Sequence, residues 1–315
     1  MGDRFTVEFN TYQRRFRQPL QTSHGIWRVR EGIIVSLSDC QGQIGQGEIA
    51  PLPWFGSETL AEALTFCRQL NGSITREEIG NIPNQLPACQ FAMMSALENL
   101  DRTYPNVDYH QLSYCHLLSP QQITPAYFAS LPKQQYPYTF KWKIGIKPIE
   151  TEIAEIKQLI QVLPADAKLR LDANGGLNLT QARKLLTVTD NLPVIEFIEQ
   201  PLPPDLFTEM LVLSKDYSTP LALDESVANC DRLEAIYQAG WQSIFVLKAA
   251  IMGYPDRLRS FCQENSLDTV FSSVFETDIG RQAVLNLAAT TGDYPSDTSE
   301  ADRQRAVGFG VNHWF

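Results

Sequence analysis

Short apolar runs recur along the middle of the chain, and each ends in a residue that can take part in chemistry. Five of them read TFKWKIG (139–145), KLRLDANGG (168–176), VIEFIEQP (194–201), PLALDES (220–226) and SIFVLKA (243–249), and a sixth, TVFSSVFET (269–277), ends in serines and a glutamate. The reactive residues stand 29, 27, 25 and 24 apart and are Lys143, Asp172, Glu199, Asp224 and Lys248. This spacing is close to the roughly 30 residues of one unit in an eight-fold β/α barrel, so the pattern predicts such a barrel.

Amphipathic segments separate these runs and predict the helices of the barrel. They cover residues 151–163, 180–186, 230–240 and 281–290, and SYCHLL (113–118) predicts the first barrel strand. Thr151 stands before Glu152 and Glu155, which predicts a capped, acidic first turn. Because polar groups at the carboxyl ends of parallel barrel strands converge on one mouth, we expect the reactive residues to meet there.

The first third of the chain has a different pattern. Apolar and polar residues alternate in FTVEF, WRVREGIIVSLSD and GQIGQGEIAP, and turn-forming residues 39–42 separate the last two, which predicts antiparallel strands. Helical spacing follows over residues 57–70, with Thr59 as N-cap, and over residues 88–100. Residues 1–110 are therefore predicted to form a small α+β domain, and the apolar tail VGFGVNHWF is expected to pack back on it.

The composition is that of an ordinary globular protein, with 43% hydrophobic and 20% charged residues among 315. The net charge of −10 argues against a nucleic-acid partner, because such proteins carry a basic surface. No stretch approaches the roughly 20 apolar residues that cross a bilayer, and the polar N-terminus predicts no secretory signal. Six scattered cysteines without a CxxC pair predict free thiols, so we expect a cytoplasmic protein. Whether it is a monomer or a homo-oligomer does not follow from the sequence.

Three of the reactive residues are carboxylates at neighbouring strand ends. Asp172, Glu199 and Asp224 can each give an oxygen to one hard cation and leave other positions for water or substrate. Mg²⁺ suits this oxygen set best and Mn²⁺ is its nearest rival, whereas the absence of Cys and His from these strand ends weakens a zinc or iron interpretation. The alternative is that the acids are helix N-caps and surface groups. Their recurrence in phase, each after an apolar run, favours a metal site.

Lysines stand on the strands before and after those that carry the three acids. Lys141 and Lys143 stand two apart, so both point to the same face, and a barrel interior does not bury two ammonium groups unless anions lie near. A lysine beside another cation has its pKa lowered and becomes a usable base. Lys248 lies on the opposite side, as a second catalytic lysine or as charge balance for the acids. The set predicts that a metal binds a substrate carboxylate, a lysine removes the proton on the adjacent carbon, and the metal stabilises the enediolate.

The motifs together resemble the enolase superfamily in its muconate-lactonizing subgroup. KWK (141–143) is similar to its base motif, DANGG, EQP and DES to its metal-ligand motifs, and LKAAIMG to its second-lysine strand. Residues 25–59 are similar to the superfamily's capping domain, whose early loop, here around His24 and Gly25, closes over substrate. The resemblance implies a modified TIM barrel, (β/α)7β, over residues 111–294. It also implies an α+β capping domain over residues 1–110, joined by the tail from about 295 to 315.

Within this subgroup, SYCHLLS, LRLDANGGLN, SSVFETDIG and SDT (296–298) are most similar to the o-succinylbenzoate synthase family. That resemblance implies dehydration of a cyclohexadiene carboxylate, SHCHC, in menaquinone or phylloquinone biosynthesis. Lys143 would be the base and would return its proton to the departing hydroxide, and a protonated Lys248 would steady the enediolate. The implied metal-shell and substrate contacts are Arg170, Asn174, Ser272, Ser273 and Gly25. One departure is Tyr254 after LKAAIMG, where a smaller residue is usual, which puts details of the pocket in doubt.

Two alternatives remain beside this interpretation. The first is an N-acylamino acid racemase, a dipeptide epimerase or a cycloisomerase of the same superfamily, because both lysines needed for racemisation are present. An epimerase is expected to carry a DxD-like acidic pair near the eighth strand, where this chain reads SDTSEAD. The second is a barrel that has lost catalysis and serves as a scaffold. Such a barrel would lack a base or a ligand, and none is missing here.

Overall fold

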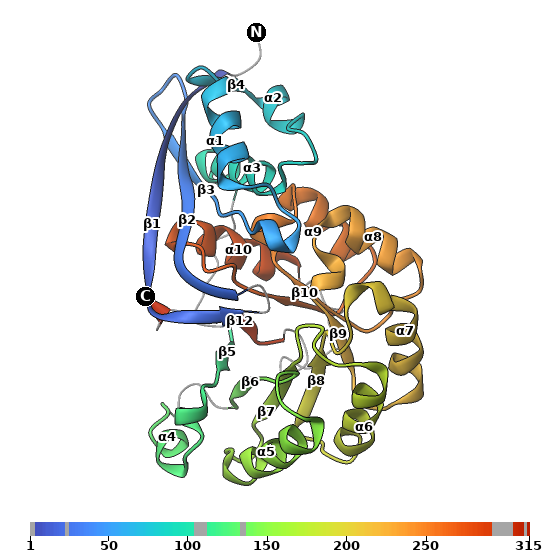
Figure 1. Cartoon of the computed structure of the whole chain (residues 1–315). Coiled ribbons are helices and arrows are strands. Elements are labelled where there is room, and N and C mark those ends of the chain that lie inside the picture. Colours follow the sequence, from blue (N-terminus) through green and yellow to red (C-terminus); the bar gives the residue numbers. More distant parts are fainter. Residues whose placement is uncertain (1–3, 23–24, 104–111, 133–136, 292–304, 312–313) are drawn as a thin grey trace.

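The computed structural model describes residues 4–22, 25–103, 112–132, 137–291, 305–311 and 314–315. Two sheets organise this part of the chain, a four-stranded antiparallel sheet from its first quarter and an eight-stranded parallel sheet from the rest. Figure 1 shows the long strands of the first sheet along one flank and the barrel helices on the other. Among the helices described, none has both the length and the apolar character that crossing a membrane requires.

The antiparallel sheet has the strand order β3-β2-β1-β4 and confirms the alternation predicted for the first third. Its strands are β1 (Arg4–Thr22), β2 (Gly25–Ser38), β3 (Ile44–Ile49) and β4 (Ser73–Thr75). The predicted turn joins β2 to β3, where the Asp39 carboxylate accepts hydrogen bonds from the backbone of Gln41 and Gln43. Strand β1 is much longer than the predicted FTVEF, because it pairs with β2 along its length and passes one register shift between Arg15 and Leu20.

Helices cover one face of this sheet. They are α1 (Leu60–Gln69), α2 (Arg76–Gly80) and α3 (Pro87–Leu100), preceded by the short 3-10 turn η1 (Pro53–Phe55). Thr59 caps α1 as predicted, in a capping box with Glu62. Helix α3 lies so close to β3 that a Cβ on Gly45 or Gly47 would stand 2.0 Å from a helix carbonyl, so only glycine allows this approach.

The parallel sheet has the order β11-β10-β9-β8-β7-β6-β5-β12, and a bridge between Ser272 and Gly308 joins its two ends into a barrel. The strands are β5 (Tyr114–Leu117), β6 (Thr139–Lys143), β7 (Lys168–Asp172), β8 (Ile195–Glu199), β9 (Leu221–Leu223), β10 (Ile244–Leu247), β11 (Thr269–Phe271) and β12 (Val307–Gly310). All six predicted apolar runs therefore form or contain barrel strands. This is the (β/α)7β architecture expected from the resemblance.

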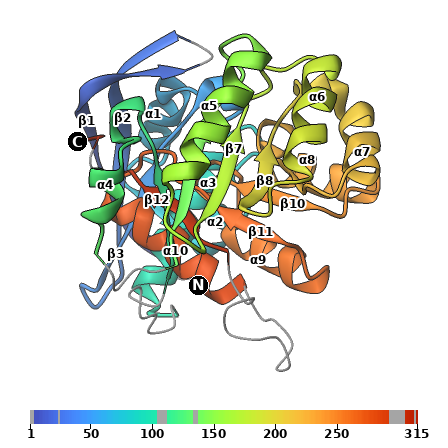
Figure 2. The ribbon, with the colours of Figure 1, turned by 90° about the horizontal axis from the view of Figure 1, so that it is seen from below.

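The barrel strands alternate with helices that lie outside them (Figure 2). These helices are α4 (Pro125–Ala129), α5 (Ile149–Val162), α6 (Leu179–Thr189), α7 (Phe207–Asp216), α8 (Cys230–Gln238), α9 (Pro255–Glu264) and α10 (Asp278–Thr291). The short 3-10 turns η3 (Pro120–Gln122), η5 (Pro204–Leu206), η6 (Glu225–Val227) and η7 (Ala249–Ile251) lie between elements. A small apolar cluster fills the barrel interior, and it consists of Phe197, Ala222, Ile244, Val246 and Val270. The cysteines are free, as predicted.

Two predictions about element boundaries need correction. Helix α5 begins at Ile149, after Pro148, so Thr151 lies inside the helix and does not cap it. Proline fixes a backbone angle suited to a helix start, and this signal was overlooked. The tail also differs from expectation, because residues 307–310 form β12, which pairs with β5 inside the barrel and not with the capping sheet. The predicted domain boundaries near residues 110 and 295 lie outside the described residues and stay predictions.

The capping domain packs on the barrel through buried polar contacts. The Arg14 guanidinium in β1 donates to the carbonyl of Glu276, and Phe315 stacks on Phe16 with ring centroids 4.8 Å apart, so the end of the tail does reach the first domain. Tyr254 donates to the carbonyls of Ile79 and Ile82, at 2.8 and 3.2 Å. Tyr254 thus joins the two domains and does not line the pocket described below, so this departure from the family pattern leaves that pocket unchanged.

Candidate active site

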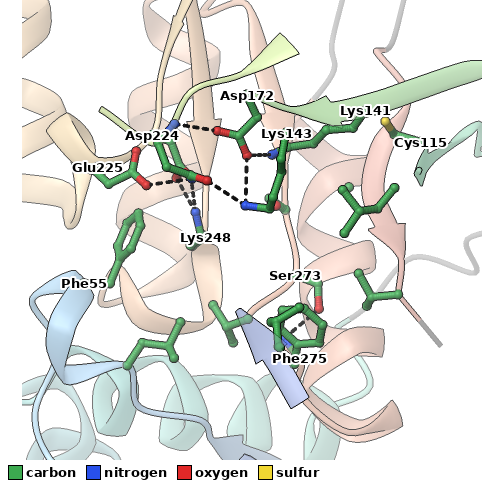
Figure 3. A pocket seen from close by; sticks show the side chains of 18 of the residues that line it. Phe55, Cys115, Lys141, Lys143, Asp172, Asp224, Glu225, Lys248, Ser273 and Phe275 are labelled. Atoms are coloured by element: carbon green, nitrogen blue, oxygen red, sulfur yellow. Dashed lines mark hydrogen bonds and ion pairs between the residues drawn. The ribbon is translucent and has the colours of Figure 1, made fainter. Parts of the chain in front are cut away.

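A pocket lies between the carboxyl ends of the barrel strands and the capping domain (Figure 3). The barrel supplies its charged side and the capping domain supplies apolar side chains. The charged and polar lining residues are Lys141, Lys143, Asp172, Asn174, Asp224, Glu225, Lys248, Ser272 and Ser273. The apolar lining includes Leu20, Trp27, Leu52, Trp54, Phe55, Cys115, Val274 and Phe275. The predicted convergence of distant strand ends is therefore found.

The three predicted ligands lie on adjacent strands and are almost completely buried. Asp172 ends β7 and Glu199 ends β8, and the two residues are direct partners in the strand register. Asp224 follows the last residue of β9. Their exposed fractions are 1%, 2% and 2%. Carboxylates buried to this degree require cations or several hydrogen bonds close by, because desolvation alone would neutralise them.

Lysine ammonium groups provide the cations that contact these acids. Lys141 Nζ lies 2.7 Å from Glu199 Oε1 and 2.8 Å from Asp172 Oδ2. Lys143 Nζ lies 3.5 Å from Asp172 Oδ2 and donates to Asn174 Oδ1 at 2.6 Å. Lys248 Nζ donates to both carboxylate oxygens of Asp224. Lys141 and Lys143 thus share one face of β6, as predicted, and Lys248 belongs to the other side of the site (Figure 3).

Burial and charge shift the pKa values of this cluster in opposite directions. Burial raises the pKa of Asp224 to about 6, against the attraction of Lys248. Burial and the charge of Asp172 raise the pKa of Glu199 as well. For Asp172, burial acts upward, but Lys141 and Lys143 outweigh it and hold its pKa well below the usual range. The ionised forms of Glu199 and Asp224 are therefore disfavoured in this site, and a bound cation would stabilise them.

The pKa of Lys141 is shifted upward, whereas a lowered pKa was predicted for a lysine beside another cation. Burial disfavours its ammonium form, but the charges of Asp172, Glu199 and Asp224 outweigh burial, and the pKa lies well above its usual range. Lys141 is the lysine most deeply embedded among the acids, with 19% of its side chain exposed against 39% for Lys143. We infer that Lys141 compensates charge, which leaves Lys143 as the better candidate base.

The donor set is chemically suited to a hard divalent cation. It contains three carboxylates from adjacent strand ends, Asp172, Glu199 and Asp224, and oxygen ligands of this kind suit Mg²⁺. Within the described residues, no three His, Cys, Asp or Glu side chains already surround a common point. The ammonium groups of Lys141 and Lys248 lie against the carboxylates instead and balance their charge. Binding a cation here requires Lys248 to release Asp224, so the assignment of these ligands remains a proposal.

Glu225 is a fourth acid of the pocket that the sequence interpretation did not single out. Its Oε1 accepts a hydrogen bond from Asn174 Nδ2 at 3.1 Å, and its Oε2 is buried and has no hydrogen-bond partner within the described part of the chain. Burial raises its pKa. Because Asn174 Oδ1 faces Lys143, Glu225 fixes the orientation of the amide that holds the candidate base. Its position directly after Asp224 in the DES motif was the available signal.

The opposite wall of the pocket comes from the end of β11 and from the capping domain. Ser272 and Ser273, both predicted as substrate contacts, lie here with Phe275. The ring of Phe55 in η1 lies 4.0 Å from Lys248 Nζ, a cation–π contact across the domain boundary. No sequence pattern pointed to Phe55, because its role depends on how the two domains dock.

Two predicted contacts lie elsewhere. Arg170 is 1% exposed, donates to Glu196 Oε2 at 2.7 Å and to the Ala306 carbonyl, and does not line the pocket. It sits two residues before Asp172 on the same strand, and its expected role beside the metal ligands and substrate stays a prediction. Gly25 begins β2 and does not line the pocket either. His24 and the SDT of residues 296–298 lie outside the described residues.

Comparison with known proteins agrees with this geometry. Residues 129–310 match the family model described as enolase C-terminal domain-like, and residues 10–100 match that of the MenC N-terminal domain. The chain is 38% identical to the o-succinylbenzoate synthase of Thermosynechococcus vestitus, over 98% of this chain and 92% of the relative. It belongs to the o-succinylbenzoate synthase family of the enolase superfamily. A second family member, from Yersinia enterocolitica, is 31% identical over 84% of this chain and 80% of its own length.

Solved structures place the family on the same architecture. The o-succinylbenzoate synthase of Thermosynechococcus elongatus, determined with magnesium in its active site, superposes with a TM-score of 0.84 at 37% identity. That comparison covers 98% of this chain and 94% of the other. The L-Ala-D/L-Glu epimerase of Bacillus subtilis superposes with a TM-score of 0.74 at 19% identity, covering 92% and 87%. The latter likeness concerns the fold alone. As a member of this family the chain is an enzyme, and the scaffold alternative is excluded.

Proposed function

We propose that this protein is an o-succinylbenzoate synthase that removes water from SHCHC in menaquinone or phylloquinone biosynthesis. The observation that carries the proposal is that Lys143 and Lys248 line one pocket, beside Asp172 and Asp224 respectively, with the buried Glu199 next to Asp172 on the neighbouring strand. Family membership over nearly the whole chain supports the same reaction. We propose that the enzyme acts in the cytoplasm on this small carboxylate, without nucleic-acid or membrane partners.

We propose Mg²⁺ as the cofactor, held by Asp172, Glu199 and Asp224, with Mn²⁺ as a possible substitute. When bound, the cation supplies positive charge that stabilises a substrate carboxylate whose adjacent carbon is losing its proton. Asn174 and Glu225 then act behind the ligands, because their hydrogen bond orients the amide oxygen that contacts Lys143. The magnesium in the related solved structure supports this choice of metal.

Lys143 is the proposed base. Its side chain is 39% exposed in the pocket, and Asn174 holds Nζ at 2.6 Å. It takes the proton from the carbon next to the substrate carboxylate and returns a proton to the departing hydroxide on the same face, so water leaves. Lys248 stays protonated and faces the developing negative charge from the other side, where the Phe55 ring centroid lies 4.0 Å from its Nζ. Lys143 therefore gains one proton in the first step and gives one up in the second, and it ends in the form in which it began.

The test is the variant Lys143→Ala, assayed by the loss of SHCHC absorbance at saturating Mg²⁺. We expect kcat/KM to fall by about 10⁴-fold, because the variant loses one group that acts as both base and acid. Lys147→Ala is the matched control. Lys147 stands four residues after Lys143, but it lies on the surface and pairs with Glu155. A rate for Lys143→Ala near that of the control would remove Lys143 from this role.

The racemase or epimerase alternative keeps the same first step. It differs in needing Lys248 to deliver a proton to the opposite face of the substrate. The ion pair of Lys248 with both oxygens of Asp224 does not separate the two activities, because cation binding releases it. An assay of deuterium exchange and racemisation with N-acylamino acids and dipeptides, beside the SHCHC assay, distinguishes the two activities.

A further inference from the structure

The Ser273 hydroxyl in the pocket wall is bound on its inner side by a buried acid. Ser273 Oγ lies 3.0 and 2.9 Å from the two carboxyl oxygens of Glu276, and it accepts a hydrogen bond from the Phe275 backbone N–H at 2.9 Å. Glu276 is 6% exposed and does not line the pocket. The serine therefore stands between substrate space and an enclosed carboxyl group.

The hydrogen-bonding capacity of one hydroxyl limits what Ser273 can offer a substrate. A hydroxyl has one proton to donate and two lone pairs to accept with, and Phe275 already uses one lone pair. If Glu276 is ionised, it can only accept, so the Ser273 proton points to Glu276 and the pocket faces a lone pair. If Glu276 is protonated, it donates to Ser273, and the serine proton is then available to the pocket.

Glu276 and Glu48 are both buried where the capping domain meets this turn, and they differ in their hydrogen bonds. Charged and titratable groups around Glu276 include Arg14 of β1, which donates to the Glu276 carbonyl, Tyr12 of β1, which donates to Glu48 of β3, and Arg30 of β2, whose charge acts on Tyr12. Asp278 and Arg281 stand on α10, which follows directly. Glu48 receives hydrogen bonds from Tyr12, from the Thr277 amide and hydroxyl, and from the Gly280 amide. Among the described residues, Glu276 receives hydrogen bonds from the Ser273 hydroxyl and the Val274 N–H. Burial, and then the charge of Glu48, raises the pKa of Glu276 to about 7.

The backbone of this turn supports a functional role. Phe275, between the two partners, has a φ of 63°, in the left-handed region that a phenylalanine rarely adopts. Strained residues persist where their surroundings hold them and are concentrated at functional sites. Here the strain places the Phe275 amide on Ser273 Oγ and the Phe275 ring on the pocket wall.

We propose that Glu276 is a specificity-determining residue, because Ser273 offers a hydrogen-bond donor to an anionic substrate group only while Glu276 carries a proton. The ligand class is a dicarboxylate, one end of which lies at the lysine cluster and the other at Ser273. This rests on the proposed function, whose product, o-succinylbenzoate, has two carboxylates. Binding of the second carboxylate then takes up one proton from solvent, which ends on Glu276.

Steady-state kinetics at saturating Mg²⁺ between pH 6 and pH 9 test this role. In the wild type we expect KM for SHCHC to rise about tenfold across the range, the effect of losing one hydrogen bond to a charged group. In Glu276→Gln the side-chain amide always donates to Ser273, so KM should stay low and flat while kcat keeps its wild-type pH profile. In Ser273→Ala, KM should be high and flat. A Glu276→Gln enzyme that keeps the wild-type rise in KM would overturn the proposal.

Calorimetry of o-succinylbenzoate binding at pH 8, in two buffers of different ionisation enthalpy, counts the protons directly. The wild type should take up nearly one proton more than Glu276→Gln, and equal uptake would overturn the proposal. Ser273→Ala provides the same comparison if Glu276→Gln does not fold. A wild-type enzyme that neither turns over SHCHC nor binds the product would contradict the proposed function. An active enzyme with equal uptake in all variants would contradict only the role of Glu276.

Discussion

Magnesium binding should weaken sharply as the pH falls, because the proposed ligands must lose their protons to bind a cation. The pKa of Asp224 is raised to about 6, so this ligand is almost fully ionised at pH 8 and mostly protonated at pH 5. Linkage to this one group lowers the apparent affinity for Mg²⁺ about tenfold between those pH values. Glu199, whose pKa is also raised, adds to the loss in the same direction, whereas Asp172 stays ionised and adds nothing.

Isothermal titration of the chelator-treated protein with Mg²⁺ at pH 8, 7, 6 and 5 measures this dependence. Circular dichroism at each pH confirms that the protein remains folded. Glu276→Gln is the control, because it removes a buried acid outside the ligand cluster and should leave the pH dependence of Mg²⁺ affinity unchanged. Dissociation constants that agree within about twofold from pH 8 to pH 5 would refute the assignment of Asp224 and Glu199 as ligands.

Two further predictions concern the contacts between the domains. Glu48→Ala should lower the free energy of unfolding by about 3 kcal/mol, because it leaves the buried donors of Tyr12, Thr277 and Gly280 without an acceptor. Urea denaturation measures the loss; Glu48→Gln, which keeps an acceptor oxygen, should lose less, and equal stabilities would contradict the account. Phe55→Leu should lower kcat/KM by about tenfold through loss of the cation–π contact with Lys248, whereas Phe55→Tyr should retain most activity. An unchanged kcat/KM in Phe55→Leu would show that this contact does not support catalysis.

The barrel could be predicted because each of its strands is visible in the sequence as a short apolar run followed by a polar residue. Each apolar run is buried and ends in a polar residue at the same rim, so spacing alone located Lys143, Asp172 and Glu199. Thr59 was equally clear, because a capping box is a contact between residues three apart. These features depend on neighbours in the sequence, which a single chain displays.

The features that were missed depend on contacts between distant segments. Residues 307–310 read as an apolar tail, and only pairing with β5 shows them to be a barrel strand. Arg170 stands two residues before Asp172, and only its contacts with Glu196 and Ala306, both distant in sequence, place it outside the pocket lining. The contact of Phe55 with Lys248 exists only where the capping domain and the barrel meet. No local pattern encodes such contacts.

The closure of the barrel has a consequence for how the protein folds. Strand β12 pairs with β5 across roughly 190 residues, and β12 also meets β11 through Gly308. Contacts so distant in sequence form slowly, since a long loop must be ordered before they contribute any stability. We therefore expect the pocket wall at Ser272 to assemble late in folding. Any ligand that binds only the closed ring will act as a folding aid, drawing the final strand into place by mass action.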